Sequence, residues 1–145
     1  MAFLNKGLRI SLIDLRADHQ VATGDEGETD TPYDEFQFDD GLIDYVKYLS
    51  AGKDTIHPTV IAVEAHAPEQ GMGVEIAMQW NSSYTNSVYT FANTINTHEG
   101  GTHEEGFRAA LTNTVNRWGE SWGLIKKRDD RVSGDDIREG LTAIV

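Results

Sequence analysis

The sequence predicts an α+β fold, and two observations lead to that class. First, several short segments alternate apolar and polar residues or are rich in Leu, Ile and Val, as strands are. Second, two segments repeat apolar residues every three or four positions, which is typical of helices with one buried face. With 145 residues, of which 39% are hydrophobic, the chain is long enough to bury a core.

The first strand is expected over Leu8 to Leu15, after a turn at Asn5-Lys6-Gly7. Val21 to Thr31 contains Gly, Thr, Asp and Glu without an apolar period, so we expect a solvated, mobile loop there. Its acidic residues do not have the alternate spacing of a calcium loop. The short alternating piece Phe36-Gln37-Phe38 resumes regular structure.

A helix is expected over Leu42 to Leu49, where apolar residues form one stripe. Asp39 or Asp40 can accept hydrogen bonds from its first backbone amides, and Ala51-Gly52 ends it. His57-Pro58 marks the next boundary, because the residue before a proline disfavours helix.

Two strands are then expected to form a hairpin. They are Thr59 to His66 and Val74 to Trp80, joined by a long turn at Pro68 to Gly73. A third strand is expected over Ser87 to Asn96.

A second helix is expected from Thr102 onward. Thr102-His103-Glu104-Glu105 fits a capping box, in which the Thr102 hydroxyl and the Glu105 carboxylate each accept a bond from a backbone amide. Apolar residues then recur at helical spacing, which predicts that one face of this helix belongs to the core. These residues are Phe107, Leu111, Val115, Trp118 and Trp122.

Ser133 is expected to cap a short third helix that stops at Gly140. Leu141 to Val145 then begins another strand. A domain seldom ends a few residues into an apolar strand, so we expect the chain to be a fragment of a longer protein.

The composition excludes several classes of protein. There are no cysteines, so disulfides, thiolate nucleophiles and cysteine-ligated zinc are excluded. The net charge of −12 argues against a free-standing nucleic-acid binder. Ten acidic residues and no Lys or Arg lie between Ala17 and Val46, while the remainder is nearly neutral. No signal peptide or membrane span is evident, and we expect a cytoplasmic protein without a membrane partner.

His98 and His103, with acidic neighbours, resemble the ligands of a metallohydrolase. The zinc motif requires two histidines four residues apart on one helix. Here the spacing is five and Gly100-Gly101 intervenes, so the pair cannot share a helical face. We expect the acidic side chains to stabilise the helix N-terminus instead.

Other catalytic patterns are missing from the sequence. No serine lies in a nucleophile elbow, and no glycine-rich phosphate loop with its lysine occurs. A basic cluster, Lys126-Lys127-Arg128 with Arg131, is expected to be a solvated loop because Asp129 and Asp130 offset its charge. We therefore predict no catalytic, cofactor-binding or metal-binding residue in this chain.

Several segments, which together extend over nearly the whole chain, resemble the DNA gyrase B proteins, the ATPase subunits of a bacterial type II topoisomerase. They are Phe3 to Leu8, Gly41 to Val46, Ile56-His57, Val74 to Asn81, Asn93 to Arg108 and Gly134 to Ala143. The last two are highly specific, because neither a helix nor a cap requires those residues in that order. The acidic stretch from Ala17 to Phe36 matches nothing in the family.

The resemblance implies two domains. Residues 1–40 correspond to the C-terminal end of a GHKL-type ATPase domain with an acidic variable loop. Residues 41–145 correspond to the N-terminal part of the transducer domain, truncated at its C-terminus. In the family, the transducer has a two-layer fold like the second domain of ribosomal protein S5, with a mixed sheet and helices on one face.

The resemblance also implies a function. Gyrase is an ATP-dependent isomerase that passes one DNA duplex through another and introduces negative supercoils, and the transducer couples ATP binding to the DNA gate. The partners of gyrase B are the gyrase A subunit, double-stranded DNA and a second copy of gyrase B. Residues that bind ATP and Mg²⁺ are expected outside this chain, before Met1 and on a Gln-Thr-Lys loop after Val145, so the fragment alone is expected to be inactive. The ATPase subunit of topoisomerase IV and a non-catalytic acidic interaction domain are the alternatives.

Overall fold

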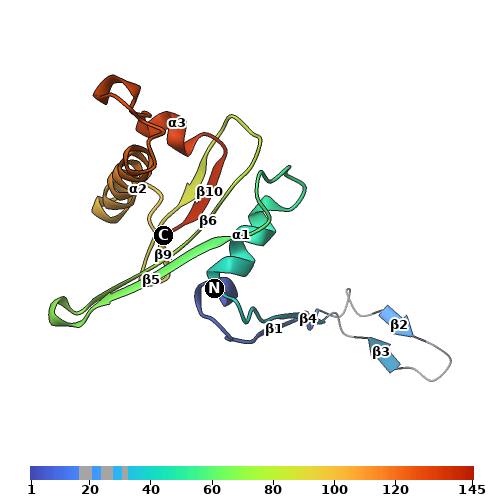
Figure 1. The fold of residues 1–145 in the computed structure, drawn as a ribbon. Helices are drawn as coiled ribbons and strands as arrows, with labels where there is room; N and C mark the ends of the chain where they lie inside the picture. The colour runs from blue at the N-terminus through green and yellow to red at the C-terminus, as the bar shows by residue number, and fades with distance from the viewer. Residues whose placement is uncertain (17–20, 24–27, 31–32) are drawn as a thin grey trace. The chain divides into compact units, whose positions relative to one another are not determined.

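The computed structural model describes residues 1–16, 21–23, 28–30 and 33–145. The chain divides into two compact units, Met1–Gly41 and Leu42–Val145 (Figure 1). We describe each unit separately.

The first unit is built on a two-stranded antiparallel sheet. Strand β1 (Ile10–Ile13) pairs with β4 (Tyr33–Phe36), with Ile10 opposite Phe36. A short 3-10 helix, η1 (Ala2–Leu4), precedes β1, and the ring of Phe3 stacks on Phe38 with centroids 3.6 Å apart. The strand predicted near Ile10 is confirmed, whereas Gln37 and Phe38 lie beyond the end of β4.

Part of the predicted acidic loop is a second antiparallel pair. Strands β2 (Val21–Thr23) and β3 (Glu28–Asp30) face each other with Val21 opposite Asp30. The prediction of an irregular loop is wrong for these six positions, because threonine and valine favour strand pairing even among acidic neighbours. The rest of the predicted loop lies outside the described residues.

The second unit contains a four-stranded mixed sheet with the order β5-β6-β10-β7. Strand β5 (Ile61–Ala67) forms the expected hairpin with β6 (Met72–Trp80), joined by the 3-10 helix η3 (Pro68–Gln70) and by Gly71. Strand β10 (Leu141–Ile144) pairs antiparallel with β6 and parallel with β7 (Ser87–Tyr89). The predicted α+β class with a mixed sheet is confirmed.

Two helices cover one face of this sheet. They are α2 (Thr102–Ser121) and the short α3 (Gly134–Arg138). Phe107, Leu111 and Ile137 from these helices pack on Leu141 and Ala143 of β10 to form the main core.

The opposite face of the sheet is covered too. Helix α1 (Leu42–Ser50) packs on β6 and β10 through a buried stripe of Leu42, Val46 and Ser50. All four residues of β10 are buried, as a strand covered on both faces must be. Figure 1 shows α1 on the side of the sheet away from α2 and α3, so the helices are not confined to the single face that we expected. Whether Asp39 or Asp40 caps α1 stays a prediction.

The strand predicted over Ser87 to Asn96 is broken. Strand β7 ends at Tyr89, and β8 (Phe91–Ala92) and β9 (Ile95–Asn96) form a separate small hairpin. Asn93 and Thr94 form its two-residue turn with φ of 48° and 70°, the left-handed geometry that tight hairpins require. The alternating pattern continued through this turn, which is why the sequence suggested one strand.

Helix α2 begins at Thr102, as predicted, but without the capping box. Gly101 is its N-cap, a residue without a side chain to accept a bond from the first amides, and no side-chain cap forms at this end of the helix. Helix α3 does have its predicted cap, because the Ser133 hydroxyl accepts a bond from the Asp136 amide at 3.2 Å.

The predicted core face of α2 is buried only in its first half. Phe107 and Leu111 are buried, whereas Trp118 and Trp122 are 54% and 70% exposed and contact each other with tilted rings, whose centroids lie 5.7 Å apart. Helical spacing alone therefore could not define where the buried face of this helix ends. No helix among the described residues combines the length and hydropathy needed to span a bilayer.

Candidate functional site

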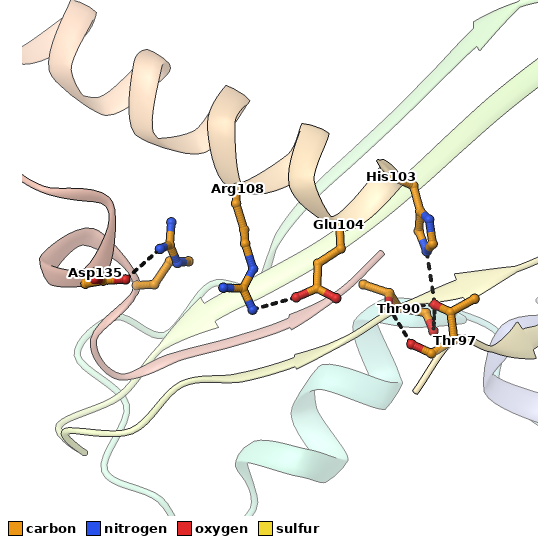
Figure 2. A network of polar contacts seen from close by, with 7 residues as sticks. Thr90, Thr97, His103, Glu104, Arg108 and Asp135 are labelled. Atoms are coloured by element: carbon orange, nitrogen blue, oxygen red, sulfur yellow. Dashed lines mark hydrogen bonds and ion pairs between the residues drawn. The ribbon is translucent and has the colours of Figure 1, made fainter. Parts of the chain in front are cut away.

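The most specific sequence motif folds into the junction between the end of β7 and the start of α2. This motif, from Asn93 to Arg108, contains the turn and second strand of the β8–β9 hairpin, a glycine link at Gly100-Gly101 and the first two turns of α2. Three side chains in and beside it meet in one polar cluster, the Thr90–Thr97–His103 cluster (Figure 2).

Thr97 lies at the centre of this cluster. Its hydroxyl donates to the Thr90 carbonyl at 2.9 Å, and its backbone amide donates to the same oxygen. The Thr90 hydroxyl lies 2.7 Å from the Thr97 hydroxyl, and His103 Nε2 lies 3.1 Å from it. These contacts are compatible with one another if the Thr90 hydroxyl and His103 Nε2 both donate to the Thr97 hydroxyl oxygen, whose own hydrogen is used on the Thr90 carbonyl. Because Thr90 is 3% exposed, these bonds are shielded from water and fasten the start of α2 to the sheet.

A charged pair lies next to this cluster on α2. Glu104 and Arg108 form an ion pair at i,i+4, and the Glu104 side chain is only 16% exposed. A methyl group at Gly100 would lie 2.8 Å from Glu104 Oε2, so the glycine permits the carboxylate to fold back over the link. Gly100 also has a φ of 76°, which favours glycine.

The far end of the sheet is closed by a second junction, the Asn81–Gly140 junction. Both the backbone and the side-chain amide of Asn81 donate to the Gly140 carbonyl, at 2.9 and 2.7 Å. The Asn81 side chain also accepts from the Ser83 amide at 3.0 Å. A methyl group at Gly140 would lie 2.1 Å from the Asn81 carbonyl oxygen, so no other residue fits here.

The basic cluster lies beyond the end of α2 and lines a shallow pocket of about 510 Å³. Within it, Arg131 donates to Glu120 at 2.7 Å, and this bond lowers the pKa of Glu120. Asp130 accepts from the Lys127 amide, so one of the two aspartates is part of the loop structure itself.

An apolar groove of about 560 Å³ lies between the outer half of the β5–β6 hairpin and the first half of α2. Its lining includes Phe107 and Ala110 of α2, Met72 and Val74 of β6, and Val145.

Comparison with known proteins gives the chain its family. A sequence model of the DNA gyrase B family matches residues 41–145, which include the whole second unit. The chain belongs to the DNA gyrase B family.

Two curated gyrase B proteins extend this similarity to the entire chain. The novobiocin-sensitive DNA gyrase B of Streptomyces niveus is 52% identical, and the DNA gyrase B of Streptomyces coelicolor is 49% identical. In both cases all of this chain is covered, but only 23% and 22% of the relative. This gyrase B chain therefore spans less than a quarter of the length of these relatives.

A solved structure shows the same fold. The 43K ATPase domain of Thermus thermophilus gyrase B, in complex with an aminocoumarin, has a TM-score of 0.76 and 26% identity. The match covers 99% of this chain and 35% of that one.

The gyrase B motif thus contains a polar junction that the sequence did not reveal. The sequence suggested His98 and His103 as a possible metal pair, yet His103 contacts Thr97 and His98 lies outside that contact. Across the described positions, no three His, Asp or Glu side chains are grouped to hold a metal ion. The spacing of Thr90 and Thr97, two threonines either side of a two-residue turn, is the signal that could have identified the cluster.

Proposed function

We propose that this chain is the segment of a DNA gyrase B protein that couples ATP binding to the DNA gate. The intact protein would use ATP to pass one DNA duplex through another and to supercoil DNA negatively. The observation that carries the proposal is the gyrase B match over residues 41–145, together with the similarity of the fold to a gyrase B ATPase domain.

The division of the chain supports separate roles for its two parts. We assign residues 1–40 to the end of the ATPase domain and residues 41–145 to the first part of the transducer. The structural division after Gly41 and the start of the family match at residue 41 both agree with this assignment.

The residues of this chain do not fit an ATP site of their own. The sequence contains no glycine-rich phosphate loop with a lysine, and Arg108, the cation within the motif, is already paired with Glu104. We therefore assign ATP and Mg²⁺ binding to other parts of gyrase B, and we expect this polypeptide alone to be inactive. The gyrase A subunit, a second copy of gyrase B and DNA are the proposed partners, and the cytoplasm is the proposed location.

The structure offers a physical route for coupling through the second unit. A movement at the start of α2 must either carry the sheet with it or break the Thr90–Thr97–His103 cluster. The cluster is shielded from water and its polar groups all have hydrogen-bond partners, so breaking it costs free energy. The helix and the sheet therefore move together.

A chimaeric gyrase B tests the proposal. The matching segment of the Streptomyces coelicolor protein would be replaced by this chain, and ATP-dependent supercoiling would be measured together with the gyrase A subunit. We expect supercoiling to be retained, while a protein with the segment deleted loses it. A folded chimaera that hydrolyses ATP but neither supercoils nor relaxes DNA would overturn the proposal. A chimaera that decatenates DNA without supercoiling it would favour the topoisomerase IV alternative.

A further inference from the structure

The connection between α1 and β5 is paired with the end of β6, but the pairing is interrupted. Thr55 forms an isolated bridge with Asn81, and regular pairing resumes at Ile61, which lies opposite Met78. Thr55 and Ile61 are six positions apart in the chain, whereas their two partners are only three positions apart. Three residues of the connection therefore bulge out of the ladder.

The imidazole ring of His57 fills the gap that this bulge leaves. The backbone amide of Trp80 donates to His57 Nε2 at 3.1 Å, where a regular ladder would offer a backbone carbonyl. On the other side of the ring, His57 Nδ1 lies 2.7 Å from the Thr59 carbonyl oxygen. The Ile56 amide donates to the Trp80 carbonyl at 3.1 Å. The side-chain amide of Gln79 donates to the His57 carbonyl at 2.9 Å.

The two contacts of the ring show which nitrogen carries the hydrogen. A backbone amide can only donate, so His57 Nε2 must present a lone pair to Trp80. A carbonyl oxygen can only accept, so Nδ1 must carry the hydrogen that Thr59 receives. The ring is therefore neutral in this arrangement. A second proton would have to bind Nε2, where it would face the Trp80 N–H and break that hydrogen bond.

The surroundings of the ring offer no charge that would favour its protonated form. Across the described positions, the printed contacts of the ring are with the Thr59 carbonyl, the Trp80 amide and the Trp80 indole, whose centroid lies 6.0 Å away. The ionisable side chains on the segments that meet here are Lys47 and Tyr48 of α1, Lys53 and Asp54 of the connection, and Arg138 and Glu139 at the end of α3. Lys53 Nζ lies 3.3 Å from the Thr142 hydroxyl, and Arg138 pairs with Asp135.

We propose that His57 is a proton-operated latch on the connection between α1 and β5. The neutral ring closes the bulge and holds the connection against the end of β6. Opening frees Nε2 to take up a proton, so lower pH favours the open form by linkage. The latch is thus fully stable where free histidine is neutral, and its stability is lost as the pH falls through the range in which histidine gains a proton. This proposal does not depend on the supercoiling function.

Amide hydrogen exchange of the 145-residue chain, followed by NMR and expressed as a protection factor at each pH, tests the latch. The Trp80 amide is the probe. The Asn81 amide is the internal control, because it donates to the Gly140 carbonyl at 2.9 Å and not to the ring. Between about pH 8 and about pH 5, we expect protection at Trp80 to fall about tenfold or more relative to protection at Asn81.

Two variants assign this pH dependence to one histidine. In His57→Gln, the side-chain carbonyl can accept from the Trp80 amide but does not titrate, so protection at Trp80 relative to Asn81 should no longer depend on pH. His66→Gln is the matched control, because His66 is an exposed histidine of the neighbouring strand β5 that contacts Glu64. It should keep the pH dependence of the parent chain.

The nitrogen NMR signals of the His57 ring provide a test that needs no variant. At about pH 8, where free histidine is neutral, we expect the hydrogen on Nδ1 and none on Nε2. A hydrogen on Nε2 at this pH would overturn the proposal. An equal fall of Trp80 protection in the parent and in a folded His57→Gln chain would also overturn it. So would a parallel loss of protection at Trp80 and Asn81, because the proton would then unfold the whole unit and not the latch.

Discussion

At the scale of single residues, the backbone geometry at Gly140 leaves no room for a side chain. The residue has a φ of 72°, and its carbonyl accepts two bonds from Asn81. Any side chain here would collide with the backbone of Asn81, which follows the end of the neighbouring strand. The glycine in the family motif is therefore explained by close backbone approach as well as by φ.

Gly140→Ala should destabilise the second unit by about 3 kcal/mol or more, because strain at φ is added to a backbone collision. Gly71→Ala is the matched control, since Gly71 has a φ of 62° and a methyl group added there would meet no atom within 4 Å. The control should cost only about 1–2 kcal/mol. Urea unfolding of both variants measures the difference, and equal costs would contradict this account of Gly140.

Asn116 is a second residue whose role is visible only in the structure. Its side chain is 5% exposed and forms two hydrogen bonds with the backbone of Val132, at 2.9 Å each. It also donates to the Thr112 carbonyl at 3.0 Å. Asn116 thus fastens the segment before α3 to α2.

We expect Asn116→Ala to lower the free energy of unfolding by about 2 kcal/mol, because it removes the hydrogen bonds of a buried side chain and leaves the Val132 amide and carbonyl without these partners. Asn113→Ala provides the control, since Asn113 lies on the exposed side of the same helix and should change stability by less than about 0.5 kcal/mol. If the two variants unfold at the same urea concentration, Asn116 does not fasten the segment before α3 to α2.

At the scale of elements, hydrophobic patterns predicted the β5–β6 hairpin and the positions of the helices, because alternation and helical spacing report burial directly. The mixed sheet was expected from the resemblance to gyrase B. The same patterns failed where backbone conformation, and not burial, determines where a strand or a helix begins or ends. The turn at Asn93-Thr94 interrupts an alternating segment. Gly101 and not Thr102 is the N-cap of α2, so the expected side-chain cap does not form. The polar junctions were not predicted, because they join residues through tertiary geometry.

The second half of α2 allows a direct test, because the sequence predicted Trp118 and Trp122 in the core and the structure exposes them. Trp118 and Trp122 are exposed, while Trp80 is half-buried and donates through its indole nitrogen to the Ile137 carbonyl at 2.8 Å. Acrylamide should therefore quench the fluorescence of Trp118 and Trp122 strongly in the isolated chain. In the Trp118→Phe, Trp122→Phe double variant, the remaining emission should be shifted to the blue and poorly quenched. Equal quenching in the parent and the double variant would place these tryptophans in the core after all.

The connection after α2 should depend on pH through Glu120. Its folded pKa is lowered by the hydrogen bond from Arg131, so the bond adds stability above the ordinary glutamate pKa of about 4.3. That stability is lost as the pH falls through the folded pKa. The stability difference between the parent and Glu120→Gln should therefore shrink between pH 7 and about pH 3. Urea unfolding of both proteins across this pH range measures the difference. If the difference does not depend on pH, the ionised Glu120–Arg131 pair is not its cause.

At the scale of the whole molecule, the central claim is that the second unit transmits force between its helices and its sheet. The Thr90–Thr97–His103 cluster is the contact through which the start of α2 is joined to the sheet. The chimaeric gyrase B is needed to test this, because we propose that ATP and Mg²⁺ bind to other parts of gyrase B.

The most direct measurement is the number of supercoils introduced per ATP hydrolysed by the chimaeric gyrase B carrying Thr97→Val. Thr114→Val is the matched control, because Thr114 is exposed on α2. Our account predicts that Thr97→Val lowers this ratio about threefold or more while ATP hydrolysis continues, and that Thr114→Val leaves it unchanged. An unchanged ratio in a folded Thr97→Val protein would contradict coupling through this junction.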